Sequence, residues 1–313
     1  MTMIMAERAD NGEDIFVYTG GEQVVPDDVT HVIVDKSVKI IRRSAFFGRD
    51  RLVSIEMHDG IEIIEEYAFF YCTSLRGSMR LPGVRVVGKR AFAVTGLTDV
   101  EFGDKLETIG TCAFAYCSSL RSVKMPTVRD IHMSAFQSCD QLTDVEMPEV
   151  ERIGHGAFQS CTLLRRIVIP LKDDIFDGDN VFYGCDNLST VDLVGGIHKI
   201  ISSLHMESWR NEMREEIDRI NSDLEDTPAD ERTRAIRQWM RSVLERLNHY
   251  KTEHYMLLKK SMTLLELALW KAKLLDENEE GHINDEAARR NERRITSGAS
   301  DVINNVLPFL ALA

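Results

Sequence analysis

Apolar residues recur at a nearly fixed interval along the first two thirds of the chain. An Ala-Phe dipeptide begins at positions 45, 68, 91, 113, 135 and 157, and Val181-Phe182 follows as a variant. In the numbering of the chain, the successive steps are 23, 23, 22, 22, 22 and 24. A fixed period of this size predicts a solenoid, in which each coil buries its apolar face against the neighbouring coils.

Each repeat contains two short apolar segments. In one unit, Val123 and Met125 alternate with polar residues, and Pro126 ends the segment. Val128 and Ile131 then mark a second segment. Alternation and a terminal proline are typical of short strands. We therefore expect two parallel strands per coil, with equivalent positions forming ladders at a spacing of about 4.8 Å.

The repeat template also carries a family resemblance. Ala-Phe-x-x-Cys-x-x-Leu, followed by a strand that ends in proline, resembles the BspA-type leucine-rich repeat over residues 29–195. The resemblance implies a curved solenoid that binds other macromolecules on its surface without enzymatic activity. Departures from the template are Arg49 and Thr95 at the cysteine position, and one extra residue within 76–80.

The patterns divide the chain into four segments. Residues 1–28 are expected to form an N-terminal cap, a hairpin with a Gly-Gly turn between two strands. Residues 29–200 form the solenoid, 205–277 a helical hairpin or bundle, and 278–313 a charged helix followed by an amphipathic tail. The expected fold class is mixed α and β, a leucine-rich repeat β-solenoid of about seven coils, each one repeat long, followed by an α-helical bundle.

Helical spacing replaces the repeat after about residue 205. One apolar face is formed by Trp209, Met213, Ile217, Ile220 and Leu224. Thr227, which precedes Pro228, is predicted to be the N-cap of a second helix. A helix over 228–275 would be about 72 Å long. We expect it either to break within 248–252 or to extend beyond the solenoid.

Apolar residues of this second helix follow heptad spacing from 236 to 268. The seam offers a surface for a second copy of the chain. The segments Leu264–Leu275 and Gly298–Leu310 resemble the C-terminal module that accompanies these repeats in proteins of unicellular algae. That resemblance implies no particular activity.

Five of the six cysteines occupy one position of the repeat, namely Cys72, Cys117, Cys139, Cys161 and Cys185. A zinc site needs ligands that converge, whereas these residues form a linear column. Disulfides are not expected in a chain without an export signal. We interpret the column as buried structural thiols, and Cys112 as a more exposed cysteine outside it.

Charges alternate in sign along two other columns. One column contains Lys39, Glu62, Arg85, Glu107, Arg129 and Glu151, and the other begins Glu56, Arg80, Glu101, Lys124, Glu146. Opposite charges on adjacent strands stabilise their pairing by roughly 0.2–1 kcal/mol each. We interpret both columns as structural ladders that help set the register.

The column beside the first ladder changes character along the chain. Ile40, Ile63 and Val86 give way to Thr108, Asp130 and Arg152 at equivalent positions. An exposed apolar stripe usually marks an interface. The candidate interaction surface is therefore Ile40, Ile63 and Val86, with Glu62 and Arg85 as its polar rim. The alternative is that residues 13–35 or the helical region cover this stripe.

The remaining features exclude several classes of function. A net charge of −13 argues against nucleic acid as a partner. The chain has neither the apolar core of a secretory signal nor an apolar run long enough for a membrane helix, so we expect an intracellular, cytoplasmic protein without a membrane span. No phosphate-binding glycine loop or nucleophile elbow occurs, and the nine histidines are scattered. Acidic residues between 173 and 179 are interpreted as a solvated insertion.

The sequence thus favours a scaffold that binds a protein partner through its solenoid, without catalysis, metal or cofactor. The alternative is a structural protein that self-associates through the seam 236–268. A third possibility is an enzyme whose site lies in the helical region.

Overall fold

The computed structural model describes residues 15–194, 204 and 206–279 of the chain. The expected tail and most of the charged segment 278–313, the first residues of the cap, and the glycines at 195–196 lie outside the described residues. The described part falls into two compact units. One contains the solenoid and Arg210–Leu244, and the other contains Leu204–Trp209 and the chain from Glu245 onward.

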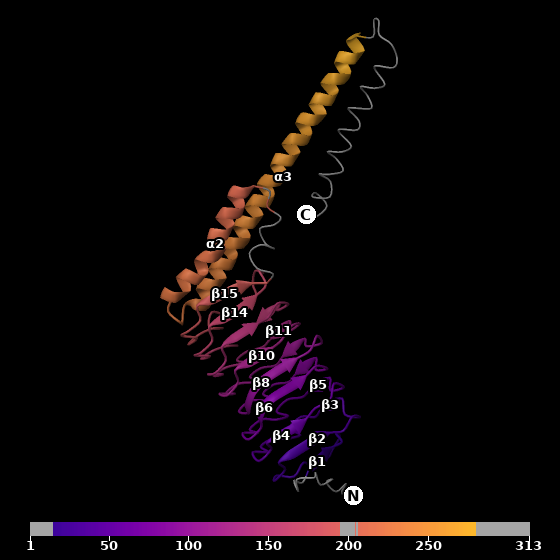
Figure 1. Ribbon diagram of the computed structural model, residues 1–313, viewed down its shortest axis with the longest axis vertical. Coiled ribbons are helices and arrows are strands. Elements are labelled where there is room, and N and C mark those ends of the chain that lie inside the picture. Colours follow the sequence, from indigo (N-terminus) through magenta and orange to yellow (C-terminus); the bar gives the residue numbers. More distant parts are fainter. Residues whose placement is uncertain (1–14, 195–203, 205, 280–313) are drawn as a thin grey trace. The chain divides into compact units, whose positions relative to one another are not determined.

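The first unit is a β-solenoid of about seven coils, as the repeat predicts, and its strands are stacked in chain order (Figure 1). The described strands pair in parallel and form three sheets. The first sheet has the order β1-β2-β4, with β1 Ile15–Tyr18, β2 His31–Val34 and β4 Ser54–Glu56.

The second and third sheets each contain one strand from six successive coils. The longer strands are β6 Arg76–Leu81, β8 Gly96–Phe102, β10 Ser122–Lys124, β12 Asp144–Glu146, β14 Arg166–Ile169 and β15 Thr190–Leu193. The shorter ones are β3 Ile40–Ile41, β5 Ile63–Ile64, β7 Val86–Val87, β9 Thr108–Ile109, β11 Asp130–Ile131 and β13 Arg152–Ile153. The pairing of β6 with β8 shifts register between Gly77 and Ser78, which pair with Leu97 and Asp99, so the residue left over is Thr98 of β8 and not one within 76–80.

The core is organised around a stack of phenylalanine rings, contributed by Phe46, Phe69, Phe92, Phe114, Phe136, Phe158 and Phe182. Neighbouring rings have centroids 4.9–5.8 Å apart and planes within 14° of one another. The backbone N–H of Phe114 donates to the carbonyl oxygen of Ala135 in the next coil at 2.7 Å, and the other coils repeat this bond. The coil spacing therefore equals a ring-stacking distance, which explains why Ala-Phe is the most regular part of the repeat.

The N-terminal cap differs from the expected hairpin. Strand β1 pairs in parallel with β2, from Ile15↔His31 to Tyr18↔Val34, and residues 19–30 contain no strand. Gly20 and Gly21, both at positive φ, turn the chain without reversing it into a hairpin. The ring of Tyr18 packs on Phe46 at 5.0 Å and is fully buried. The segment thus extends the ring stack, and this packing decides its pairing.

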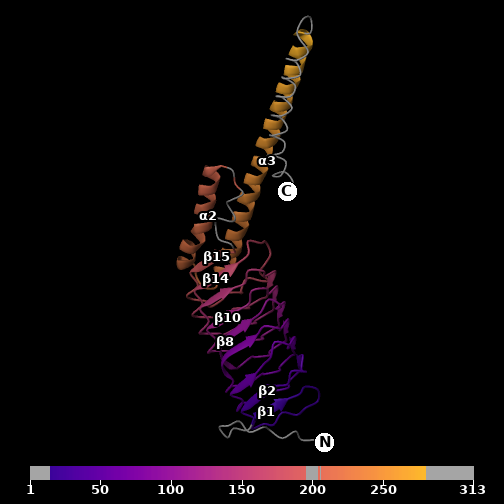
Figure 2. The same ribbon diagram turned by 45° about the vertical axis from the view of Figure 1, so that its right-hand side comes forward.

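Two helices follow the solenoid, α2 Glu207–Asp226 and α3 Arg232–Glu279. Within the first unit, the start of α3 lies beside α2 in both views (Figures 1 and 2). The expected apolar face of α2 is buried, and the indole N–H of Trp239 donates to the carbonyl oxygen of Glu216 at 3.0 Å. Both helices are confirmed, although α3 begins later than predicted. Thr227 does not cap α3, because its hydroxyl donates to the carbonyl oxygen of Asp223 in α2.

Side chains of these helices complete the hydrogen bonds of the last coils. The N–H of Phe182 donates to the hydroxyl of Thr233 at 3.0 Å, where earlier coils use the carbonyl of the next coil. The N–H of Val191 likewise donates to the side-chain oxygen of Asn221 at 2.9 Å. A solenoid needs such a termination, since its last coil otherwise presents unpaired backbone groups.

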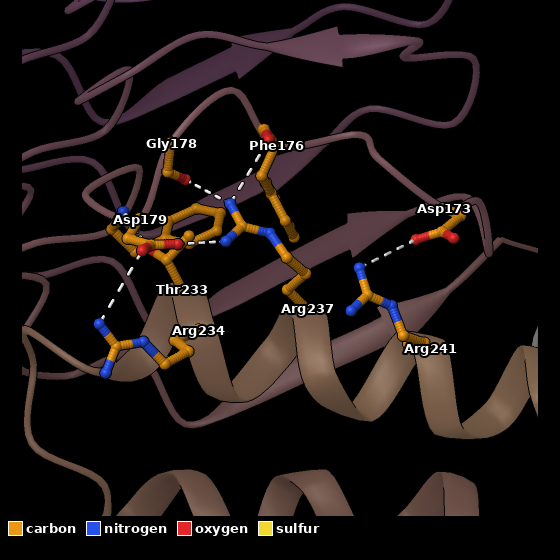
Figure 3. A network of polar contacts seen from close by, with 9 residues as sticks. Asp173, Phe176, Gly178, Asp179, Thr233, Arg234, Arg237 and Arg241 are labelled. Atoms are coloured by element: carbon orange, nitrogen blue, oxygen red, sulfur yellow. Dashed lines mark hydrogen bonds and ion pairs between the residues drawn. The ribbon is translucent and has the colours of Figure 1, made fainter.

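Two acidic residues of the lengthened last repeat, Asp173 and Asp179, contact arginines of α3, as Figure 3 shows. Asp179 forms an ion pair with Arg237, and Asp173 lies 3.9 Å from Arg241. The guanidinium of Arg237 lowers the pKa of Asp179 through this hydrogen bond. The acidic residues of this segment are exposed, as expected for a solvated insertion. The sequence did not indicate that Asp173 and Asp179 also pair with a helix that is distant in the sequence.

Helix α3 is continuous, so the break expected within 248–252 does not occur. Its 48 residues correspond to about 72 Å at 1.5 Å per residue. Ile236, Met240 and Val243 of the heptad seam are buried in the first unit. In the second unit, Tyr250 stacks on Trp209 with centroids 5.1 Å apart.

The ring stack makes a direct prediction about stability. Phe114→Ala removes a fully buried ring with neighbours on both sides, and should lower the free energy of unfolding by about 3–5 kcal/mol in urea titrations. Phe47→Ala is the control, because Phe47 is 46% exposed, and it should cost about 1 kcal/mol or less. Equal losses for the two variants would contradict the role given to the stack.

Candidate functional site

The structure brings the predicted apolar stripe together. Ile40, Ile63 and Val86 are paired in register on β3, β5 and β7. Their neighbours Ile41, Ile64 and Val87 point into the core and are fully buried. The three stripe residues are only half-buried. They therefore form the outward column of the short-strand sheet, and cover by the rest of the chain is incomplete.

Further along the same column the apolar character ends. Thr108, Asp130 and Arg152 continue the register on β9, β11 and β13. Arg152 forms an ion pair with Asp130 at 3.0 Å. The fold thus accepts both apolar and charged residues in this column.

The predicted rim residues belong to the first charge ladder and have partners within it. Lys39 lies 3.2 Å from Glu62, and Arg85 binds both carboxylate oxygens of Glu107. Backbone bonds join the same positions, for example from the N–H of Arg85 to the carbonyl oxygen of Glu62 at 2.8 Å. The rim is therefore close to neutral, because its charges are balanced between adjacent coils.

The second ladder is formed by the longer strands. Glu101 lies between Arg80 at 3.5 Å and Lys124 at 3.3 Å. Beyond it, Arg166 contacts both Glu146 and Asp192 at 2.9 and 2.6 Å. These partners raise the pKa of Arg166. All of these side chains are more than a third exposed, so each pair contributes little to stability.

The cysteine column is buried and its thiols have structural partners. The Sγ of Cys139 donates to the carbonyl oxygen of Phe114 at 3.2 Å, and the other four repeat this bond one coil apart. Burial raises the pKa of Cys72 to about 12 and that of Cys139 well above its ordinary value. Thiols with raised pKa values are poor nucleophiles. At the two departures, Thr95 contacts the Sγ of Cys117 at 3.3 Å, and Arg49 donates to the carbonyl of Val25.

In the part of the chain that the structure describes, no group of three or more His, Cys, Asp or Glu side chains is arranged to hold a metal ion. None of the described helices is both long and apolar enough to cross a membrane.

A surface that the sequence patterns did not identify lies on the turns after the short strands. It is a hollow of about 500 Å³ whose walls include Phe70, Arg90 and Tyr116. One column of the repeat indicates this hollow through the size of its residues. The residue after the stacked phenylalanine is large in most coils, but is alanine at positions 93 and 115.

Comparison with known proteins agrees with the repeat geometry. The family model described as BspA type leucine rich repeat region matches six copies over residues 27–84 and 85–208. No curated protein matches the chain. The family match ends at 208, so the algal resemblance of Leu264–Leu275 and Gly298–Leu310 is not supported by it, and the second of these segments lies outside the described residues.

Two solved structures illustrate the similarity. A leucine-rich repeat protein from Bacteroides ovatus is 17% identical, with 62% of this chain and 68% of that chain covered and a TM-score of 0.41. A leucine-rich repeat protein of T. pallidum is 23% identical, with 59% and 77% covered and a TM-score of 0.40. At these identities the likeness concerns the fold alone.

The charge ladders predict a salt-dependent loss of stability. Glu107→Lys would place three cations in adjacent coils, because Arg85 and Arg129 flank position 107. The melting temperature should fall at low ionic strength and recover in high salt, where such repulsion is screened. Calorimetry at two salt concentrations measures this, with Glu22→Lys as an equal charge change outside the ladder. An unchanged melting temperature, or a decrease that is the same at both salt concentrations, would show that the charges of the ladder do not stabilise the solenoid electrostatically.

Proposed function

The chain belongs to the BspA-type leucine-rich repeat family, and from that premise we propose that it is a non-enzymatic scaffold that binds a protein partner through its solenoid. The observation that carries the proposal is the column of Ile40, Ile63 and Val86. These half-buried apolar side chains lie side by side at positions where the fold also accepts Thr108, Asp130 and Arg152. Their apolar character is therefore not demanded by the repeat.

The surroundings of the stripe support an apolar partner surface. Glu62 and Arg85 are partnered within the ladder, so the rim carries little net charge. A polar, solvent-accessible rim around an apolar centre is the usual organisation of a protein–protein interface. The net charge of −13 supports the exclusion of nucleic acid.

The proposal includes a cytoplasmic location without catalysis or a cofactor. The cysteine column consists of free thiols, which a reducing compartment maintains. The raised pKa values of its members support a structural role for them rather than a reactive one.

The stripe can be tested without disturbing the fold. Replacing Ile40, Ile63 and Val86 together by threonine gives the column the residue that it already has at position 108, so strand pairing should be retained. The full-length chain serves as bait, because α2 and α3 complete the last coils. A partner captured by the natural chain should bind the triple variant at least tenfold more weakly, which corresponds to a loss of about 1.4 kcal/mol.

Thr108→Val is the matched control, since it changes the same column without removing an apolar residue, and it should leave the partner's affinity unchanged. Undiminished binding by a folded triple variant would move the interface away from the stripe.

Self-association is a second candidate, favoured by the exposure of the later part of the seam. Leu257 and Leu264 are 51% and 59% exposed on α3, and Leu267 and Trp270 beside them are also exposed. Large apolar side chains that recur at heptad spacing are suited to pairing with a second helix. The earlier part of the seam is buried and is not available for this.

Light scattering separates the two candidates. Self-association predicts a concentration-dependent mass that approaches twice the monomer value of 35.6 kDa. Leu257→Lys with Leu264→Lys should then restore the monomer, because two charges in an apolar seam are costly. Lys259→Leu with Lys260→Leu provides a control on the exposed surface of the same helix. A monomeric mass at every concentration would end this candidate and leave the scaffold proposal intact.

A further inference from the structure

The hollow on the turns is made by two small residues in a column of large ones. The position after each stacked phenylalanine is occupied by Phe47, Phe70, Ala93, Ala115, Gln137, Gln159 and Tyr183. Where the two alanines follow one another, a hollow of about 500 Å³ opens between Phe70 and Gln137. Its size is in the range of ligand-binding clefts.

Bulky residues line this hollow in a backbone conformation that disfavours them. The next position of the repeat has positive φ in each coil and is glycine at both ends, at 48 and 184. Beside the hollow it is Tyr71, Val94 and Tyr116, with φ of 63°, 61° and 62°. Left-handed conformations are unfavourable for non-glycine residues and cluster at binding sites. These side chains are therefore retained at a cost to stability.

The hollow also contains a cation without a carboxylate partner. Arg90 lies over the ring of Phe70, with its Cζ 5.9 Å from the centroid. Arg43 has the same relation to Tyr67, but it also forms an ion pair with Glu66 at 3.6 Å. Among the described residues, no Asp or Glu makes such a pair with Arg90.

We propose that the hollow binds a peptide segment of a protein partner, with an apolar side chain over Ala93 and Ala115 and a carboxylate on Arg90. The exposed rings of Tyr71 and Tyr116 provide the apolar surface, while Ala93 and Ala115 form the floor of the hollow and are themselves buried. A guanidinium fixed over an aromatic ring is suited to bidentate binding of a carboxylate. One cation on a chain of net charge −13 does not suit a polyanion. This site is distinct from the Ile40, Ile63 and Val86 stripe, so each can fail without the other.

The test uses a random heptapeptide library displayed on phage and selected on the full-length chain. Selected peptides should share an Asp or Glu next to a large apolar residue. Binding should fall at least tenfold in Ala93→Gln with Ala115→Gln, which fills the hollow with the residue found at 137 and 159. Arg90→Gln should remove the preference for the acidic residue. Gln159→Ala and Arg121→Gln are matched controls outside the hollow and should bind as the natural chain does.

Cys112 provides a readout located at the site. It lines the hollow and is only half-buried, whereas the other five cysteines are buried. A bound peptide should slow alkylation of Cys112 by iodoacetamide. Melting curves confirm that each variant is folded. If the double variant does not fold, Arg90→Gln decides the matter, because Arg90 is exposed. Peptides without a shared acidic and apolar pair, or pairs that bind all variants equally and leave Cys112 reactive, would overturn the proposal.

Discussion

The stacking of one phenylalanine per coil is the interaction on which the rest of the structure depends. It places the ring centroids of adjacent coils 4.9–5.8 Å apart, and the same regular stacking aligns the backbone bonds, the cysteine column and the charge ladders. Both ends of the stack are completed by neighbouring parts of the chain. Tyr18 extends the ring stack at the start, and at the end the hydroxyl of Thr233 accepts a hydrogen bond from the backbone N–H of the last phenylalanine. The inward columns are therefore nearly invariant from coil to coil.

The outward columns are free to vary for the same reason, and the proposed functions lie in them. The column of Ile40 and Ile63 is apolar in one half and charged in the other, while its strand pairing is unchanged. The column of Ala93 and Ala115 is small where its other members are large. In both columns, other coils have a different residue at the same position, so the fold does not require these residues. Such departures mark candidate binding surfaces, whereas the regular positions explain stability.

The inward columns could be predicted from the sequence because their period is strict. The stacked rings and the buried thiols both followed from counting residues. Three features could not be predicted in this way. An apolar strand before two glycines suits a hairpin, and only the contact of Tyr18 with Phe46 favours parallel pairing. The role of Asp179 depends on Arg237, far along the chain. The hollow arises where two alanines replace large residues, and the spacing of the repeat does not reveal how the neighbouring side chains surround the space that is left.

The central claim is that the inward columns determine stability and that the outward columns are free to vary. A saturation scan of stability over residues 113–134, with proline omitted, tests this claim most directly. The account predicts losses above about 1 kcal/mol at the inward positions, namely Ala113, Phe114, Cys117, Leu120, Val123, Met125, Val128 and Ile131, all of which are buried. Substitutions at exposed Ser118, Ser119 and Arg121 should stay within about 0.5 kcal/mol. Losses at these exposed positions as large as those at the buried ones would contradict the account.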